Sequence, residues 1–452
     1  MRCSNFITAR TAPVLALLAT LGSPIDGHSS SLSFAEAEQQ LATNWQWLAQ
    51  QADVDAWQAQ QQALNSLNLP QLSVTIAGIA YEKDVRFDIP VINQPAELDV
   101  FRSGIRSQFN LLWPLYTGGR TQAAQQQIAE RVGEAEAEQR LQQQKLIKRL
   151  FDLYFSAQMT RQVVQVRQQA LSTLELHVHK AKRFEQEGLI TALQRMQAEV
   201  AHADARRSLI EAQHQASDVR AALANLLQAP SLQCLSTPLP TPVQLEHPAD
   251  WYLQLAKQHN PVFSQLSAKA GQLAQQLLIE QGKRLPEVFL VASYDLNRSA
   301  TPLTEPDWSV GLGMRYHFTT PINRSASATA VVNRQQQLQY TEQQASADIQ
   351  LAVESSYRLV QQQQQHFELL QQDLKLAREH ARLQQHAFAE GMATSLDVTD
   401  ARLKQAAAEI QALQAAFLHV SALAQLAQLT GQPELLGRWL PTLQQQQPCL
   451  DD

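Results

Sequence analysis

Cysteine, glycine and aromatic residues are scarce in this chain of 452 residues, which has 3 Cys, 15 Gly and 6% aromatic residues. Three cysteines exclude a disulfide-stapled scaffold, and no Cys or His spacing is typical of a zinc site. The net charge of -6 provides no cationic field for phosphates, so nucleic acid is not expected as the main partner. No apolar run reaches about 18 residues, which argues against a membrane-spanning helix.

Motifs that carry chemistry are also missing. The sequence has no nucleophile and base constellation, no phosphate-binding loop and no cofactor fingerprint, so we expect no enzyme and no cofactor. Two histidine pairs, His177 with His179 and His380 with His386, lack the spacing of metal ligands on one helix face. We interpret them as solvated helix positions and expect no metal site.

Glutamine and alanine are abundant instead. Glutamine is about one residue in seven, and 44% of the chain is hydrophobic. This composition favours long helices around a sizeable core. The Gln runs at 361–365 and 444–447 are interpreted as a solvated helix face and a C-terminal tail.

The N-terminus has the order of a secretory signal. Arg2 and Arg10 precede an apolar run at 12–21, and small and turn residues follow. We expect residues 1–30 to be a signal peptide, cleaved between about Gly22 and Ser31. A cytosolic N-terminus without regular structure is the alternative.

The sequence contains an internal repeat. An offset of 203 residues aligns residues 187–193 with 390–396 and Tyr154 with Tyr357. Nearer the N-terminus, an offset of 216 residues aligns Asn44 with Asn260. Chance similarity between Ala- and Gln-rich helices would not keep Gly, Thr, Tyr and Pro in register. The chain is therefore predicted to contain two copies of the same structural unit.

Each repeat is predicted to contain a helix, two strands, a long helix and a return helix. In the first repeat, residues 31–240, these are 32–67, 72–81, 105–113, 120–187 and 193–228. In the second repeat, residues 241–436, they are 251–282, 288–297, 308–318, 324–390 and 396–430. A tail at 437–452 follows. The chain is thus mainly α with a small β part.

The two long helices determine the length of the predicted structure. At about 1.5 Å per residue each is on the order of 100 Å long, so it must pack along its length in an antiparallel coiled coil. Two shorter helices placed end to end match one long helix. We expect 193–228 to stack with 251–282, and 396–430 with 32–67.

The predicted strands alternate between apolar and polar residues, as barrel strands facing lipid do. The polar positions are Arg106, Gln108, Asn110, Arg315 and His317. A soluble, half-buried sheet gives the same pattern. Four strands cannot close a barrel, since about eight are needed, so copies of the chain must join if the sheet lies in lipid. Strand count favours three copies and a 12-stranded barrel.

At this point the sequence resembles the TolC family of outer membrane efflux and secretion channels. The resemblance is carried by the order and duplication of weak motifs: Leu-Pro at 69–70 and 285–286, Pro-Leu-Tyr-Thr-Gly-Gly-Arg at 114–120, and Gly-x-x-Thr-x-Leu at 188–193 and 391–396. It implies a homotrimer in the outer membrane with a periplasmic tunnel, working with a periplasmic adaptor and an inner membrane pump. In the second half, residues 318–324 read Phe-Thr-Thr-Pro-Ile-Asn-Arg, without the Gly-Gly pair of the first half.

The resemblance also implies a charged constriction at the periplasmic tip. Asp397 and Asp400 share one helix face, and acids at these positions would ring the mouth of the channel. A capping box with Thr394 is a compatible interpretation. Gln194 and Ala393 stand where the family often pairs an acid with a base, so we expect no ionic lock there.

The tip turns are the adaptor-docking positions that the resemblance implies. They comprise Gly188, Thr191, Leu193, Gly391, Thr394 and Leu396. Export to an oxidising compartment would also allow a disulfide between Cys234 and Cys449, which each follow a return helix.

Two function classes remain open from the sequence. One is a passive outer membrane conduit for efflux or type I secretion, with a drug, metal, peptide or protein as cargo. The other is a soluble periplasmic coiled-coil adaptor or structural rod.

Overall fold

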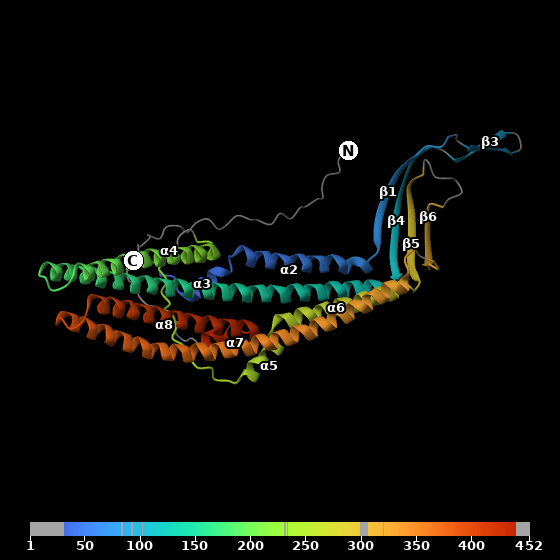
Figure 1. Ribbon diagram of the computed structural model, residues 1–452. Coiled ribbons are helices and arrows are strands. Elements are labelled where there is room, and N and C mark those ends of the chain that lie inside the picture. The colour runs from blue at the N-terminus through green and yellow to red at the C-terminus, as the bar shows by residue number, and fades with distance from the viewer. Residues whose placement is uncertain are drawn as a thin grey trace.

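The computed structural model describes residues 31–82, 85–91, 94–101, 103–229, 232, 234–298, 306–319 and 321–439. The predicted signal peptide, Cys449 and most of the predicted tail lie outside these residues. Long helices run side by side, with a small sheet at one end and the two tip turns at the other (Figure 1). The prediction of a mainly helical fold with a small antiparallel sheet is confirmed.

The elements follow the repeat. The helices are α1 (Phe34–Leu41), α2 (Trp45–Leu64), the 3-10 helix η1 (Asn65–Asn68), α3 (Arg120–Gln186), α4 (Ala192–Leu227), α5 (Ala249–His259), α6 (Pro261–Gly282), α7 (Arg324–Ala389), α8 (Ser395–Thr430) and α9 (Leu435–Trp439). The strands are β1 (Gln71–Ile79), β2 (Val85–Val91), β3 (Gln94–Phe101), β4 (Gly104–Tyr116), β5 (Glu287–Arg298) and β6 (Trp308–Arg315).

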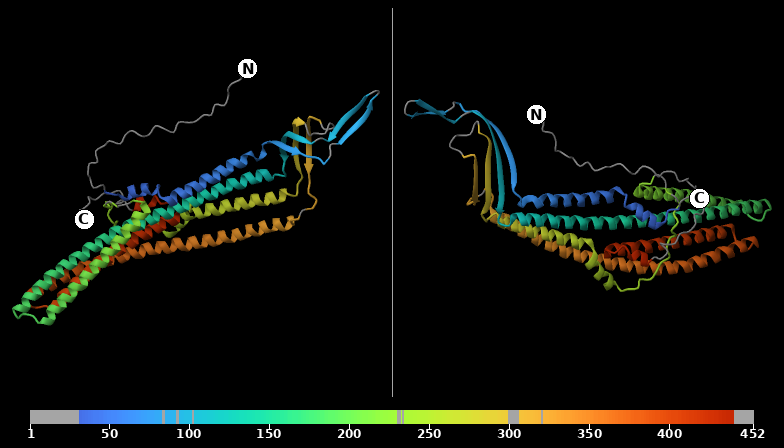
Figure 2. Two further views of the ribbon diagram at one scale, coloured as in Figure 1. Left: turned by 90° about the horizontal axis from the view of Figure 1, so that it is seen from above. Right: turned by 180° about the vertical axis from the view of Figure 1, so that it is seen from behind.

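Four strands form one antiparallel sheet in the order β1-β4-β5-β6. A second hairpin, β2 with β3, was not predicted. It pairs Pro90 with Pro95. Prolines cannot donate to a ladder, so they weaken the strand signal in this segment, for which no element was predicted. It projects beyond the sheet (Figure 2).

The strand bounds differ from the prediction at two ends. β4 continues through Pro114 to Tyr116, with a shift in register that accommodates the proline. β6 ends at Arg315, opposite the first residue of β5, Glu287. His317 therefore lies beyond the sheet, and its assignment to a strand was wrong.

The end-to-end stacking of the shorter helices also differs from the prediction. α2 and α4 both pack on α3, whereas α6 and α8 contact both α3 and α7. Hydrogen bonds between helix ends join α2 to α4 and α6 to α8. Each stack is thus formed within one repeat, whereas we expected stacks that combine the two repeats. The linker after α4 instead carries the chain across the middle of the rods to α5 (Figures 1 and 2).

Two asparagines make these stacks. Asn44 caps α2, accepting from Gln46 N at 2.8 Å, and its amide donates to the Leu226 carbonyl at 2.7 Å. Asn260 does the same at the start of α6. It accepts from Val262 N at 3.0 Å, and its amide donates to the Leu429 carbonyl at 2.9 Å. Asn44 thus joins the start of α2 to the end of α4, and Asn260 joins the start of α6 to the end of α8. Both lie at a break inside a segment predicted as one continuous helix.

The largest buried cluster lies at the same level along the rods. Phe34 and Phe155 each pack against the other three rings of a group that also contains Phe151 and Tyr154, with ring centroids 4.7–5.6 Å apart. The Tyr154 hydroxyl donates to Leu32 O at 2.7 Å and accepts from Thr237 N at 3.1 Å. These bonds fix the N-terminal segment and the inter-repeat linker to α3.

α8 is the helix, among the described residues, that is long and apolar enough to cross a membrane by length and composition. No unbroken apolar run is visible there in the sequence, because glutamine, histidine and serine interrupt it. The most apolar part of α8 is 61% buried, in contact with α3 and α7. It is therefore a core helix of the rods.

The two return helices end in different ways at equivalent positions. α8 ends at Gly431, with φ +73°, and a Cβ there would lie 2.3 Å from the His259 carbonyl oxygen. α4 ends at Gln228, with φ 54°, the non-glycine residue of positive φ in the described part of the chain. The left-handed conformation costs a side chain about 1–2 kcal/mol.

This difference predicts opposite effects of two substitutions. Gln228→Gly should raise the free energy of unfolding by about 0.5–1 kcal/mol, because glycine adopts this conformation without strain. Gly431→Ala should lower it by more than about 2 kcal/mol, because strain and the clash with His259 add. Denaturant unfolding followed by circular dichroism measures both.

Gly391→Ala is the matched control. Gly391 has φ +75° and nothing within 4 Å of its Cβ position, so only the conformational cost of about 1–2 kcal/mol applies. Equal destabilisation by the Gly391 and Gly431 substitutions would refute the close packing of α8 against the α5–α6 break.

Candidate functional site

Two regions at opposite ends of the rods carry the candidate functional residues. One is the four-stranded sheet, and the other is the pair of tip turns that join α3 to α4 and α7 to α8 (Figure 1).

The strand register places apolar residues together on one face of the sheet. Cross-strand pairs on this face include Val74 with Phe109, Phe109 with Tyr294, and Tyr294 with Trp308. The face continues along every strand, through Leu72, Ile76, Ile105, Leu111, Trp113, Val288, Leu290, Ala292, Val310, Leu312 and Met314.

This apolar face is uncovered. Exposed fractions reach 73% for Leu72, 70% for Leu312 and 71% for Met314. Such a large exposed apolar surface marks a contact with lipid or with another protein.

The opposite face is polar and internally bonded. Arg106 forms an ion pair with the buried Asp295 at 3.2 Å, and Asn110 donates to Thr75 Oγ1 at 3.1 Å. Gln108 pairs in register with Asp295. The Arg315 guanidinium lies 5.2 Å from the ring centroid of Phe289. Four of the five predicted polar positions, all except His317, thus share one face.

The tip turns have the same geometry in both repeats. Gly188 and Gly391 have φ of +74° and +75°, a conformation that favours glycine. The next residue donates back into the helix in each case, Leu189 N to Phe184 O at 2.7 Å and Met392 N to Ala387 O at 2.8 Å. This pattern is the Schellman ending of a helix.

A capping box opens each return helix. Thr191 and Gln194 exchange bonds of 3.0 and 3.3 Å, and Thr394 and Asp397 exchange bonds of 2.8 and 3.2 Å. The hydrogen bonds from Thr394 hold the pKa of the Asp397 carboxyl below its usual value. Asp397 is therefore ionised at neutral pH, and with Asp400 it stays exposed to solvent.

Apolar side chains also project from the tip. Leu193 is 62% exposed and Leu396 45%. They are equivalent residues of the two repeats, each two residues after the capping threonine. Two further residues were singled out in the sequence at the tip. Ala393 lies in the turn before Thr394, and the Gln194 side chain accepts from Thr191 N in the capping box.

An ion-pair cluster at the first tip was missed by the sequence analysis. Arg195 contacts Glu185 at 2.7 Å and Glu199 at 2.5 Å, and so joins α3 to α4. These contacts raise the pKa of Arg195 and lower that of Glu199. The equivalent residue in the second repeat is Val398, which is buried. The two tips are therefore alike in backbone and different in charge.

His177 was assigned to a solvated helix face, and this was wrong. Its side chain is buried, and Nε2 lies 2.8 Å from Ser395 Oγ on α8. Burial lowers the pKa of the imidazole. In the described residues no group of three or more His, Cys, Asp and Glu side chains could hold a metal ion. Cys234 is disulfide-bonded; because Cys449 lies outside the described residues, its pairing with Cys234 stays a prediction.

Comparison with known proteins adds to this geometry. The model of the outer membrane efflux protein family matches residues 34–228 and 252–432. No curated protein sequence matches the chain.

Three solved structures share its fold at 16% sequence identity. CusC, described with its transmembrane channel formation, has a TM-score of 0.76 over 89% of this chain and 92% of its own. The outer membrane protein VceC of Vibrio cholerae has a TM-score of 0.73 over 88% of this chain and 96% of its own. The MtrE outer membrane channel of Neisseria gonorrhoeae, in its open state, has 0.72 over 89% of each chain.

Proposed function

Because the chain belongs to the outer membrane efflux protein family, we propose that three copies form one passive conduit from the periplasm across the outer membrane. The family places the protein in the outer membrane as an efflux channel. Its match supports a channel and not the soluble rod considered above. The conduit itself supplies no energy; a pump in the inner membrane does.

The uncovered apolar face of the sheet carries this proposal. In lipid every backbone polar group must be bonded within protein, so the outer edges of β1 and β6 cannot stay open. Pairing β6 of one copy with β1 of the next closes the ring. Two copies give 8 strands, about the number whose interior is filled by side chains, whereas three give 12 and leave a lumen.

In this ring the apolar face contacts lipid and the polar face lines the lumen. Arg106, Gln108, Asn110 and Arg315 then meet the passing substrate. Each copy adds four helical columns, α3, α7 and the two stacks, to a tunnel that continues the barrel into the periplasm.

At the far end of the tunnel, the tip turns form the periplasmic mouth. Asp397 and Asp400 from three copies place six carboxylates around it. Their field attracts cations and repels anions. The capping bond of Asp397 is compatible with this role, because it accepts from Thr394 and leaves the carboxylate charged.

The exposed leucines of the tip are the docking surface for a periplasmic adaptor. Gly188 and Gly391 set the turns, Thr191 and Thr394 fix the start of each return helix, and Leu193 and Leu396 project from it.

The sheet predicts a side-dependent effect of charge. Leu312→Arg on the apolar face should destabilise the membrane-inserted barrel by about 2–4 kcal/mol near the bilayer midplane. Ser309→Arg, three residues earlier on the polar face, is the control and should assemble almost normally. Heat-resistant trimer in outer membrane fractions measures assembly, and equal assembly of both variants would contradict the assigned orientation.

The acidic mouth predicts a change in ion selectivity. Asp397→Asn with Asp400→Asn should reduce the cation-to-anion permeability ratio severalfold in planar bilayers, because the ring loses its charge while an amide oxygen can still cap α8. Asp348→Asn, an exposed acid on α7 far from the tip, should leave the ratio unchanged. An unaltered ratio in the double variant would remove the ring from the mechanism.

The docking surface predicts loss of export without loss of protein. Leu193→Asp with Leu396→Asp should reduce adaptor co-purification and export at least tenfold, because buried apolar contacts give way to charges. Leu351→Asp, at an equally exposed leucine (63%) on α7, is the control. Normal export by the tip variant at normal membrane abundance would place docking elsewhere.

A further inference from the structure

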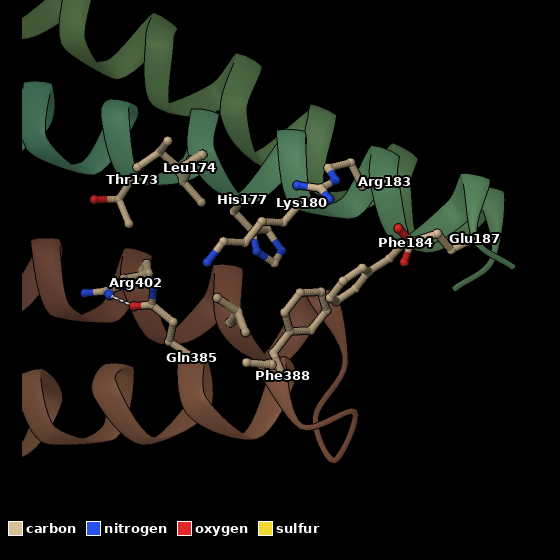
Figure 3. Close-up of a pocket in the computed structure, with 13 residues that line it drawn as sticks. Thr173, Leu174, His177, Lys180, Arg183, Phe184, Glu187, Gln385, Phe388 and Arg402 are labelled. Atoms are coloured by element: carbon tan, nitrogen blue, oxygen red, sulfur yellow. Dashed lines mark hydrogen bonds between the residues drawn. The ribbon is translucent and has the colours of Figure 1, made fainter. Parts of the chain in front are cut away.

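A cavity of about 350 Å³ lies between α3 and the α7–α8 hairpin, close to the tip turns (Figure 3). Its size is within the range of small-molecule sites, about 300–1,000 Å³. Its apolar wall contains Leu174, Phe184, Phe388 and Val398. All the residues that line the cavity belong to one chain.

Aromatic rings form one end of the cavity. The ring centroids of Phe184 and Phe388 are 5.4 Å apart, and the His177 ring lies 4.9 Å from that of Phe388. These residues come from α3 and α7, so the two hairpins meet here through aromatic contacts. A flat, apolar ligand would find matching surfaces at this end.

Cations dominate the charge of the lining. Lys180, Arg183 and Arg402 line the cavity against a single carboxylate, that of Glu187, so these side chains sum to +2 (three minus one). No ion pair joins any of the three cations to a carboxylate in the described part of the chain. The cavity is therefore built to receive negative charge.

Arg402 provides the clearest sign of a missing ligand. Its Nη1 donates to Gln405 Oε1 at 3.0 Å and its Nη2 to Gln385, so both partners are neutral amides. Its Nε is buried and has no partner. Burial without a compensating anion lowers the pKa of the guanidinium. Since buried donors are normally satisfied, an acceptor is expected at this nitrogen.

The two ends of the cavity differ in chemistry. In Figure 3 the Lys180 side chain extends toward Arg402, while Phe184 and Phe388 lie at the other end. His177 lies between the two ends. It bonds Ser395, and burial together with Lys180 keeps its pKa low, so it is neutral and adds no charge.

We propose that this cavity binds an aromatic carboxylate, with the acid group between Lys180 and Arg402 and the ring against Phe184 and Phe388. A cation would be repelled, and an inorganic anion would leave the aromatic end empty. The ligand would contact α3, α7 and α8 together and stabilise the hairpin spacing seen here, because it binds best where both hairpins contribute.

The first test compares two probes of the same shape. Calorimetry with the purified full chain in lipid nanodiscs should show binding of 2-naphthoate at neutral pH. The neutral alcohol 2-naphthylmethanol should bind at least tenfold more weakly. Absent naphthoate binding, or equal affinity for both probes, would overturn the proposal.

The second test locates the site. Arg402→Gln and Lys180→Gln should each weaken naphthoate binding about tenfold. Arg358→Gln, an exposed arginine on α7 far from the cavity, should not. Lys180 is exposed and makes no ion pair among the described residues, so its substitution tests the site even if the Arg402 variant misfolds. Undiminished binding by the Lys180 variant would place naphthoate elsewhere and refute the assignment.

Discussion

An antiparallel sheet with one continuous apolar face and two open edges is the constraint on which the rest of the structure depends. The register places Phe109, Tyr294 and Trp308 side by side on the apolar face, and all three are exposed in the part of the chain that the structure describes. Water cannot solvate this face favourably, and lipid cannot satisfy the edge strands, so neither solvent suits a single copy. Closure with further copies, as proposed above, satisfies both conditions. In that ring the helices leave the sheet as a matching circle, in agreement with the long rods that lie side by side in each chain (Figure 1).

The rods are held in register by a small set of repeated polar contacts. Asn44 and Asn260 each cap one helix and bond the last turn of another, at equivalent positions of the two repeats. These bonds bring four shorter helices to the length of two long ones. The aromatic cluster around Tyr154 lies at the same level and fixes the inter-repeat linker. The middle of the molecule is thus its best-packed region, whereas the sheet and the tip expose the groups that serve function.

The sequence predicts much of this fold because its signals are local. Period-two alternation gives β1, β4, β5 and β6, and unbroken helical pattern between Gly119 and Gly188 gives α3. Signals that depend on partners are missing. The choice of stack depends on a contact between Asn44 and Leu226, 182 residues apart, which no pattern encodes. The β2–β3 hairpin contains prolines, which weaken its strand signal. His317 lies beyond the sheet because β5 begins at Glu287, opposite Arg315. His177 looks solvated because its partner, Ser395, lies on another hairpin.

The two tips combine one backbone conformation with different charged side chains. Both have a glycine of positive φ and a threonine cap, so the turn was kept while the charges diverged. In the first repeat Arg195 is neutralised by Glu185 and Glu199. In the second repeat the corresponding position is the buried Val398, which lines a cavity where Arg402 lacks an acid. The exposed acids Asp397 and Asp400 and the cavity-lining Arg402 therefore lie within a few residues of each other on α8. Because the acids face solvent whereas Arg402 lines the cavity, they form no ion pair in the described part of the chain, and both the proposed acidic mouth and the proposed ligand site depend on this separation.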